Sequence, residues 1–87
     1  MHKFEVSENL QEILKKLSKK NKNLYEQILG KMNEIVNSYA IEHYKNLRYN
    51  LKELKRVHIG HFVLVFRFNR QTNTLYFEDF DHHDKIY

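Results

Sequence analysis

The amino-acid sequence predicts an α+β fold with the element order β-α-α-β-β-β, in which a helical hairpin packs on one face of a small antiparallel sheet. Between residues 7 and 39 the apolar side chains recur at helical spacing, and from Leu51 onward their spacing changes to two residues, as in strands. The chain has 87 residues, no proline and no low-complexity linker. We therefore expect residues 1–87 to form a single domain that buries about 60–65% of the surface of its unfolded chain.

The first half of the chain contains a short strand candidate and two helix candidates. Residues 4–6 alternate in polarity, and Ser7 or Asn9 can cap the helix that follows. The apolar stripe of this helix consists of Leu10, Ile13, Leu14 and Leu17. In the second helix, Asn23 and Glu26 have the spacing of a capping box. Its apolar stripe, which we expect to be core, consists of Tyr25, Ile28, Leu29, Met32, Ile35, Val36 and Tyr39.

The second half predicts three strands in an antiparallel meander. After a connecting segment at 43–50, the runs "ELKRVHI" (53–59), "FVLVFRF" (62–68) and "TLYFEDF" (74–80) are rich in β-branched and aromatic residues. Short turns separate them, and the tail "DHHDKIY" follows. Because two helices can cover only one face of such a sheet, we expect the other face to be open and to hold the binding site.

The composition and charge of the chain indicate which kind of partner and which cellular compartment to expect. The net charge of +4, with a pI near 9.3, suggests a polyanionic partner such as nucleic acid, or an acidic protein. The chain has no cysteine, which excludes disulfides and thiolate metal sites. Its N-terminus is too polar for a signal peptide, and no run approaches the roughly 18 apolar residues that span a bilayer. We expect a cytoplasmic protein without a membrane partner.

Alternation along the strands gathers a basic cluster on the open face. Val57 and Ile59 suit the core, so Arg56 and His58 point to the other side. On the next strand the phenylalanines suit the core. Arg67 then lies on the open face, beside Val63 and Val65. The remaining candidates are His61 at the rim of the face, one of the tail histidines His82 and His83, and Tyr87.

These residue types suit RNA cleavage without a metal. The reaction needs a base for the 2′-hydroxyl proton, a cation beside the phosphorane and an acid for the leaving 5′-oxygen. Histidine can perform either proton transfer at neutral pH, arginine matches phosphate geometry, and tyrosine can stack on a base.

Simpler interpretations compete with this one. A histidine on a half-exposed strand is most often a polar surface residue, and we expect His2 and His43 to be bystanders. The "DHHD" run could bind a metal. However, neighbouring residues of a strand point to opposite faces, so His82 and His83 can share one ion only where the chain bends. We therefore expect no metal and no cofactor.

The sequence resembles the RelE/ParE toxin superfamily. The stretch "LKRVHIGHFVLVF" (54–66) resembles the basic–hydrophobic hairpin of that superfamily, and "HHDKIY" (82–87) resembles its closing His-Arg-x-x-hydrophobic-Tyr. The segment "YKNLRYNLKEL" (44–54) resembles the segment that leads into the hairpin. The element order and the chain length also agree, so the resemblance covers nearly the whole chain.

The resemblance implies a type II toxin that cuts mRNA in the ribosomal A site and is held inactive by a cognate antitoxin. By position, Arg56 and His58 occupy the two basic strand sites, His83 occupies the C-terminal arginine site, and Tyr87 is the terminal aromatic residue. Lys45 and Arg48, from the preceding segment, join Arg56 and Arg67 as expected RNA-binding residues.

The chain also departs from the superfamily pattern. The arginine that follows the hairpin aromatic in the superfamily is Val63 here, and Arg67 is the candidate to replace it. Histidines stand at two basic positions, as in the histidine-using YafQ-like variant. We therefore expect His58 and His83 to be the acid–base pair, with His61 as a third candidate. The alternative is a non-catalytic member, either a degenerate toxin that binds only its antitoxin or a ParE-like gyrase inhibitor.

Overall fold

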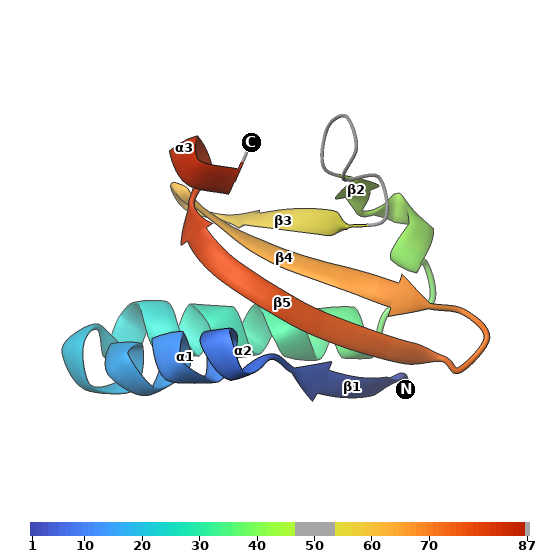
Figure 1. Ribbon diagram of the computed structural model, residues 1–87, viewed down its shortest axis with the longest axis horizontal. Helices are drawn as coiled ribbons and strands as arrows, with labels where there is room; N and C mark the ends of the chain where they lie inside the picture. The colour runs from blue at the N-terminus through green and yellow to red at the C-terminus, as the bar shows by residue number, and fades with distance from the viewer. Residues whose placement is uncertain (47–53, 87) are drawn as a thin grey trace.

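The computed structural model describes residues 1–46 and 54–86, and it arranges them as a layer of two helices against one face of a curved sheet (Figure 1). The elements are β1 (Lys3–Val6), α1 (Glu8–Lys20), α2 (Lys22–Val36), the 3₁₀ turn η1 (Ile41–His43), β2 (Lys45–Asn46), β3 (Lys55–Ile59), β4 (Phe62–Asn69), β5 (Thr74–His82) and α3 (His83–Ile86). The expected α+β class and element order are confirmed. Across the described ranges, no helix combines the length and the apolar character needed to cross a membrane.

Short polar side chains determine where the helical hairpin begins and turns. The Ser7 hydroxyl accepts a hydrogen bond from the Leu10 N–H (3.1 Å) and donates one to the Glu78 carbonyl (2.6 Å), so it caps α1 and ties it to β5. Asn21 ends α1 and caps α2, since its side chain accepts from the Leu24 N–H at 3.2 Å. The predicted capping box at Asn23 is therefore wrong, because α2 begins one residue before it.

The sheet has the strand order β1-β5-β4-β3-β2. As expected, β3, β4 and β5 form an antiparallel meander, with His58 opposite Val63 and Leu64 opposite Phe80. Strand β1 adds to the free edge of β5 in the parallel direction, so the complete sheet is mixed. The two-residue strand β2 pairs with β3, in a region where the sequence suggested only a connecting segment.

The main core lies between the helices and the sheet. Its largest fully buried side chains include Phe66 and Phe77 from the sheet and Leu10, Ile28 and Ile35 from the helices. Leu29 and Tyr39, which the helical spacing assigned to the core, are exposed. Helix α2 ends at Val36, so the helical period does not reach Tyr39.

A shift in register divides the β4–β5 pairing. Val65 lies opposite Asp79 and Phe66 lies opposite Phe77, so Glu78 is an extra residue on β5. Such a bulge bends its strand and increases the local twist. In Figure 1, β5 curves across the sheet and delivers the C-terminal turn α3 to the side away from α1 and α2.

The face without helices is less open than the sequence suggested. Val63 and Val65 are buried on that side, and Leu54 packs against them. Turn α3 also lies over this side of the sheet (Figure 1). The accessible polar groups therefore surround a small apolar patch instead of covering the whole face.

We predict that Phe66→Ala lowers the free energy of unfolding by about 3–5 kcal/mol, because the ring is fully buried. It packs edge-on against Tyr44 (5.4 Å between ring centroids) and next to Phe77 (6.1 Å). Urea denaturation followed by circular dichroism measures the loss. The matched control is Tyr39→Ala, which removes an exposed ring and should change the stability by no more than about 0.5 kcal/mol. Equal losses in the two variants would contradict this description of the core.

Candidate functional site

Three of the predicted RNA-binding and catalytic residues meet in one shallow hollow. Lys45, Arg56 and His58 line a hollow of about 260 Å³ beside the β2–β3 pair. Lys45 lies directly opposite Arg56 in the register of that pair. The hollow is therefore flanked by two permanent positive charges and by the imidazole of His58, which suits an anionic ligand such as a phosphate group.

Strand alternation explains why Arg56 and His58 share a face. Val57 and Ile59 belong to the core between sheet and helices, so their neighbours Arg56 and His58, which alternate with them along the strand, point to the opposite side. There Arg56 pairs with Val65 and His58 with Val63. This part of the sequence prediction is confirmed by the register of the strands.

A second group of polar side chains lies at the end of β5. Gly60, with a φ of 62°, allows the tight turn that ends in His61. The backbone N–H of His83 donates to the His61 carbonyl at 3.0 Å, which ties the start of α3 to this turn. The His61 and His82 rings stack at 6.3 Å, and the His82 and His83 rings lie 4.6 Å apart. We call His61, His82, His83 and Asp84 the imidazole cluster.

Polar contacts orient the rings of His83 and His82. Nδ1 of His83 lies 3.1 Å from the His61 carbonyl oxygen, and its Nε2 lies 3.0 Å from Oδ1 of Asp84. Both partners only accept, so either ring nitrogen of His83 can donate, and both donate when the ring is charged. The Asp84 N–H donates to Nδ1 of His82 at 3.3 Å, so this nitrogen presents a lone pair. The strand ends at His82, and this bend brings together two rings that strand parity would have separated.

Arg67 lies on the same face as Arg56 but is already engaged. Its Nε lies 3.3 Å from a carboxylate oxygen of Glu78, and its guanidinium carbon lies 4.0 Å from the centre of the Tyr76 ring. Glu78 is the bulge residue of β5, so the bulge positions the carboxylate that holds Arg67. Any role of Arg67 in binding phosphate has to compete with this ion pair.

The other acidic residues of the tail have structural roles. Asp79 accepts hydrogen bonds from the N–H of Phe80 (2.8 Å) and from the Asn9 side chain (2.9 Å). Asp81 accepts from the N–H of His82 at 2.7 Å. Among the tail carboxylates in the described residues, Asp84 is the one that lies within ion-pair distance of the histidine rings. The predicted site residues Arg48 and Tyr87 lie outside the described residues.

Two residues that the sequence analysis did not select also line the Lys45–Arg56–His58 hollow. His43, expected to be a bystander, and Tyr44 both contribute to it. Burial, followed by the negative charge of Glu34, raises the pKa of Tyr44, so its hydroxyl is protonated at neutral pH. The sequence signal for both was their position just before β2, whose pairing with β3 the pattern did not reveal.

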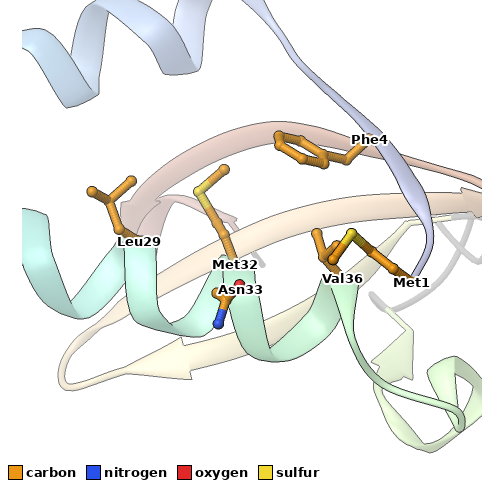
Figure 2. A pocket seen from close by; sticks show the side chains of 6 residues that line it. All are labelled: Met1, Phe4, Leu29, Met32, Asn33 and Val36. Carbon is orange, nitrogen blue, oxygen red and sulfur yellow. The ribbon is translucent and has the colours of Figure 1, made fainter.

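A different surface feature lies on the helical side of the molecule. Figure 2 shows Met1 and Phe4 facing Leu29, Met32, Asn33 and Val36 of α2 across a largely apolar hollow of about 290 Å³. Phe4 is 53% exposed and Leu29 is 39% exposed. Large exposed apolar side chains that gather in one place are typical of protein-contact surfaces.

Solved structures define the class to which this fold belongs. The isolated RelE toxin of Escherichia coli aligns with a TM-score of 0.72 at 18% identity, covering 94% of this chain and 84% of that chain. The toxin of the RelBE2 toxin–antitoxin complex of Mycobacterium tuberculosis gives 0.63 at 19% identity, covering 94% and 98%. A metal-bound toxin of Helicobacter pylori gives 0.70 at 25% identity, covering both chains completely. The fold is that of the RelE/ParE toxin superfamily.

Sequence comparison narrows the class to one family. No family model matches the chain. A Methanocaldococcus jannaschii protein named "Putative toxin RelE4" is 49% identical over 88 aligned positions, which cover 100% of this chain and 92% of that protein. The chain therefore belongs to the RelE family of type II toxin–antitoxin toxins, as its hairpin and C-terminal motifs predicted.

We predict that the neutral imidazole of His83 is protonated on Nδ1 in Asp84→Ala, because this variant removes the carboxylate beside Nε2 and leaves the His61 carbonyl beside Nδ1. Long-range ¹H–¹⁵N correlation spectra report which nitrogen carries the proton. The exposed His43 serves as the comparison and should favour the Nε2–H form, as free imidazole side chains do. An Nε2–H tautomer at His83 in this variant would show that the contact with the His61 carbonyl is not formed in solution.

Proposed function

We propose that the protein is a ribosome-dependent mRNA endoribonuclease that needs no metal for catalysis. The observation that carries this proposal is the placement of imidazole and guanidinium groups on the side of the sheet that the helical hairpin leaves free. Arg56 and His58 point to that side from β3, and α3, which begins at His83, lies on the same side of the sheet (Figure 1). Membership of the RelE family supports the same activity.

The proposed reaction is an in-line attack of the RNA 2′-hydroxyl on the neighbouring phosphorus. One imidazole removes the hydroxyl proton, the P–O5′ bond breaks, and a second imidazole protonates the leaving oxygen. The products are a 2′,3′-cyclic phosphate and a free 5′-hydroxyl. We propose His58 and His83 for these two steps, with His61 as the third candidate. For His83 the exchanging atom is Nε2, since Nδ1–H is held by the His61 carbonyl.

Cationic groups would bind the phosphate and stabilise the phosphorane. Arg56 and Lys45 lie side by side at the hollow that contains His58, which makes them the strongest candidates. Arg67 could assist if substrate replaced Glu78 as its partner. From the resemblance, we propose that Arg48 binds RNA and that Tyr87 stacks on or orients the substrate.

One observation favours a second candidate function. Val63 occupies the position at which the superfamily pattern has an arginine, and its side chain is fully buried next to Leu54. It supplies no charge to a phosphate. If the remaining cations do not compensate, the protein acts without cutting RNA, either as a degenerate toxin that only binds its antitoxin or as a ParE-like gyrase inhibitor.

We predict that His58→Ala and His83→Ala each lower codon-phased mRNA cleavage by about 10²–10⁴-fold, which is the usual contribution of a general acid or base. Primer extension on ribosome-bound mRNA after induction measures the cut sites. His2→Ala serves as a control, because His2 lies on the far end of the sheet, where its ring packs on Phe68. Circular dichroism verifies that each variant is folded.

Three other outcomes of these experiments distinguish between the candidate functions. Full cleavage by the His58→Ala/His83→Ala double variant would reject the proposed acid–base pair. Growth arrest of the wild-type protein without codon-phased cuts would favour the gyrase-inhibitor alternative. Absence of both arrest and cleavage would favour the degenerate toxin.

We propose that a cognate antitoxin neutralises the protein in the cytoplasm and that it contacts the apolar hollow between β1 and α2. The M. tuberculosis relative was solved as a toxin–antitoxin complex, which supports an antitoxin partner. Apolar side chains of the partner would cover Phe4 on β1 and Leu29 on α2, which both line this hollow and are both exposed. The net charge of +4 favours an antitoxin that is acidic around this apolar contact.

We predict that Leu29→Glu weakens antitoxin binding by at least about tenfold, because it places a charge in an apolar contact without a partner. Isothermal titration calorimetry with the purified antitoxin measures the affinity. Glu26→Gln, one helical turn earlier on α2, is the control for a general change of surface charge. Wild-type affinity of Leu29→Glu would place the antitoxin elsewhere.

A further inference from the structure

We propose that His82, His83 and Asp84 form a binding site for a divalent transition metal of the zinc class. The three residues are consecutive, and one nitrogen or oxygen atom from each can be chosen so that all three atoms lie within 4.8 Å of one another. Two imidazole nitrogens and one carboxylate oxygen are a donor set that zinc accepts. The bend between β5 and α3 is what makes this arrangement possible.

The separations between the donor atoms are close to those around a bound ion. Two ligands that each lie about 2.1 Å from a tetrahedral zinc ion are about 3.4 Å apart. Here one oxygen of Asp84 lies 3.0 Å from Nε2 of His83, and the other lies 3.4 Å from Nδ1 of His82. Small rotations of the half-exposed side chains therefore suffice to close the site.

Hydrogen bonds already hold the rings as metal-binding histidines are held. A histidine that binds a metal through one nitrogen usually donates its other ring N–H to a backbone carbonyl or a carboxylate. His83 donates Nδ1–H to the His61 carbonyl, and this leaves Nε2 directed toward Asp84. The ring orientation that zinc requires is thus present before the ion arrives, and an ion bound at Nε2 leaves the proton on Nδ1.

The electrostatics of the cluster also favour a cation. Nδ1 of His82 accepts the Asp84 N–H at 3.3 Å, so an ion bound at this nitrogen replaces that hydrogen bond, while a carboxylate oxygen of Asp84 lies 3.4 Å away. The negative charge of that carboxylate attracts a positive ion to the two rings. The side chains are 39%, 40% and 73% exposed for His82, His83 and Asp84, so an ion can enter from solvent. Water, or the His61 ring stacked on His82, can complete the coordination.

Metal binding would oppose the proposed RNA cleavage, and this consequence rests on the proposed function. The ion would occupy Nε2 of His83, which is the atom proposed to exchange a proton with RNA. The enzyme would then be inhibited by zinc and reactivated by a chelator. The binding site itself does not depend on this consequence, because it is defined by the geometry of the cluster alone.

Calorimetric titration of Zn²⁺ into the purified full-length protein tests the site without RNA. We expect saturable binding of one ion and at least about a tenfold loss of affinity in both His82→Ala and Asp84→Asn. His43→Ala, which removes a histidine outside the cluster, should bind zinc as the wild type does. Absence of saturable binding, wild-type affinity in both cluster variants, or an equal loss in His43→Ala would overturn the proposal.

Nuclear magnetic resonance of the wild-type protein gives a second measurement that does not depend on variants. Zinc should shift the ¹⁵N signals of Nε2 of His83 and of a ring nitrogen of His82, while His2 and His43 stay in place. Shifts confined to other histidines would overturn the proposed ligand set.

A cleavage assay then tests inhibition separately. If the wild type cuts mRNA, added Zn²⁺ should lower the rate and a chelator should restore it, whereas the residual cleavage by His82→Ala should be insensitive to zinc at the same concentration. Zinc binding without any RNA cleavage would reject the proposed function and leave the metal site standing. RNA cleavage without zinc binding would reject the metal site and leave the proposed function standing.

Discussion

The pairing of β4 with both of its neighbours is the interaction on which the rest of the structure depends. Its residues Val63 to Phe66 are buried on both faces, toward the helices on one side and toward Leu54 on the other. The register with β3 decides that His58 and Arg56 point away from the helices. The register with β5, including the bulge at Glu78, decides where that strand ends and hence where His82 and His83 lie. A slip of one residue in either pairing would reverse the faces.

The sequence could predict those elements whose evidence is local. Apolar spacing identified both helices and the three-stranded meander, because a buried stripe or a buried face requires that spacing over many residues. The apolar spacing extended the second helix to Tyr39, whereas α2 ends at Val36, because spacing alone does not show where a helix ends. It predicted a strand at residues 4–6 but not the partner or direction of β1, because four residues of alternating polarity can join either edge of a sheet in either direction. Only the free edge of β5 in the folded molecule determines that choice.

The candidate site likewise has one part that the sequence predicted and one part that it did not. The faces of Arg56 and His58 were predictable because both alternate along the strand with the core residues Val57 and Ile59. The arrangement of His82, His83 and Asp84 was not, since strand parity has no meaning after the strand ends and the chain turns into α3. The burial of Val63 next to Leu54, and the ion pair that holds Arg67, likewise depend on contacts between distant segments. The local sequence pattern therefore identified the candidate residues, and the tertiary structure determined which of their side chains lie close enough to act together.

The parallel pairing of β1 with β5 has a consequence for the synthesis of the protein. Lys3 lies opposite Thr74 and Val6 opposite Phe77, so the first strand to leave the ribosome needs the last strand as its partner. A chain made from its N-terminus onward can form the helical hairpin early, yet it cannot complete the sheet until β5 has emerged. The same late strand leads into α3 and its histidines. A nascent copy therefore lacks both its completed sheet and its imidazole cluster until β5 and α3 have emerged, whatever ligand that cluster binds.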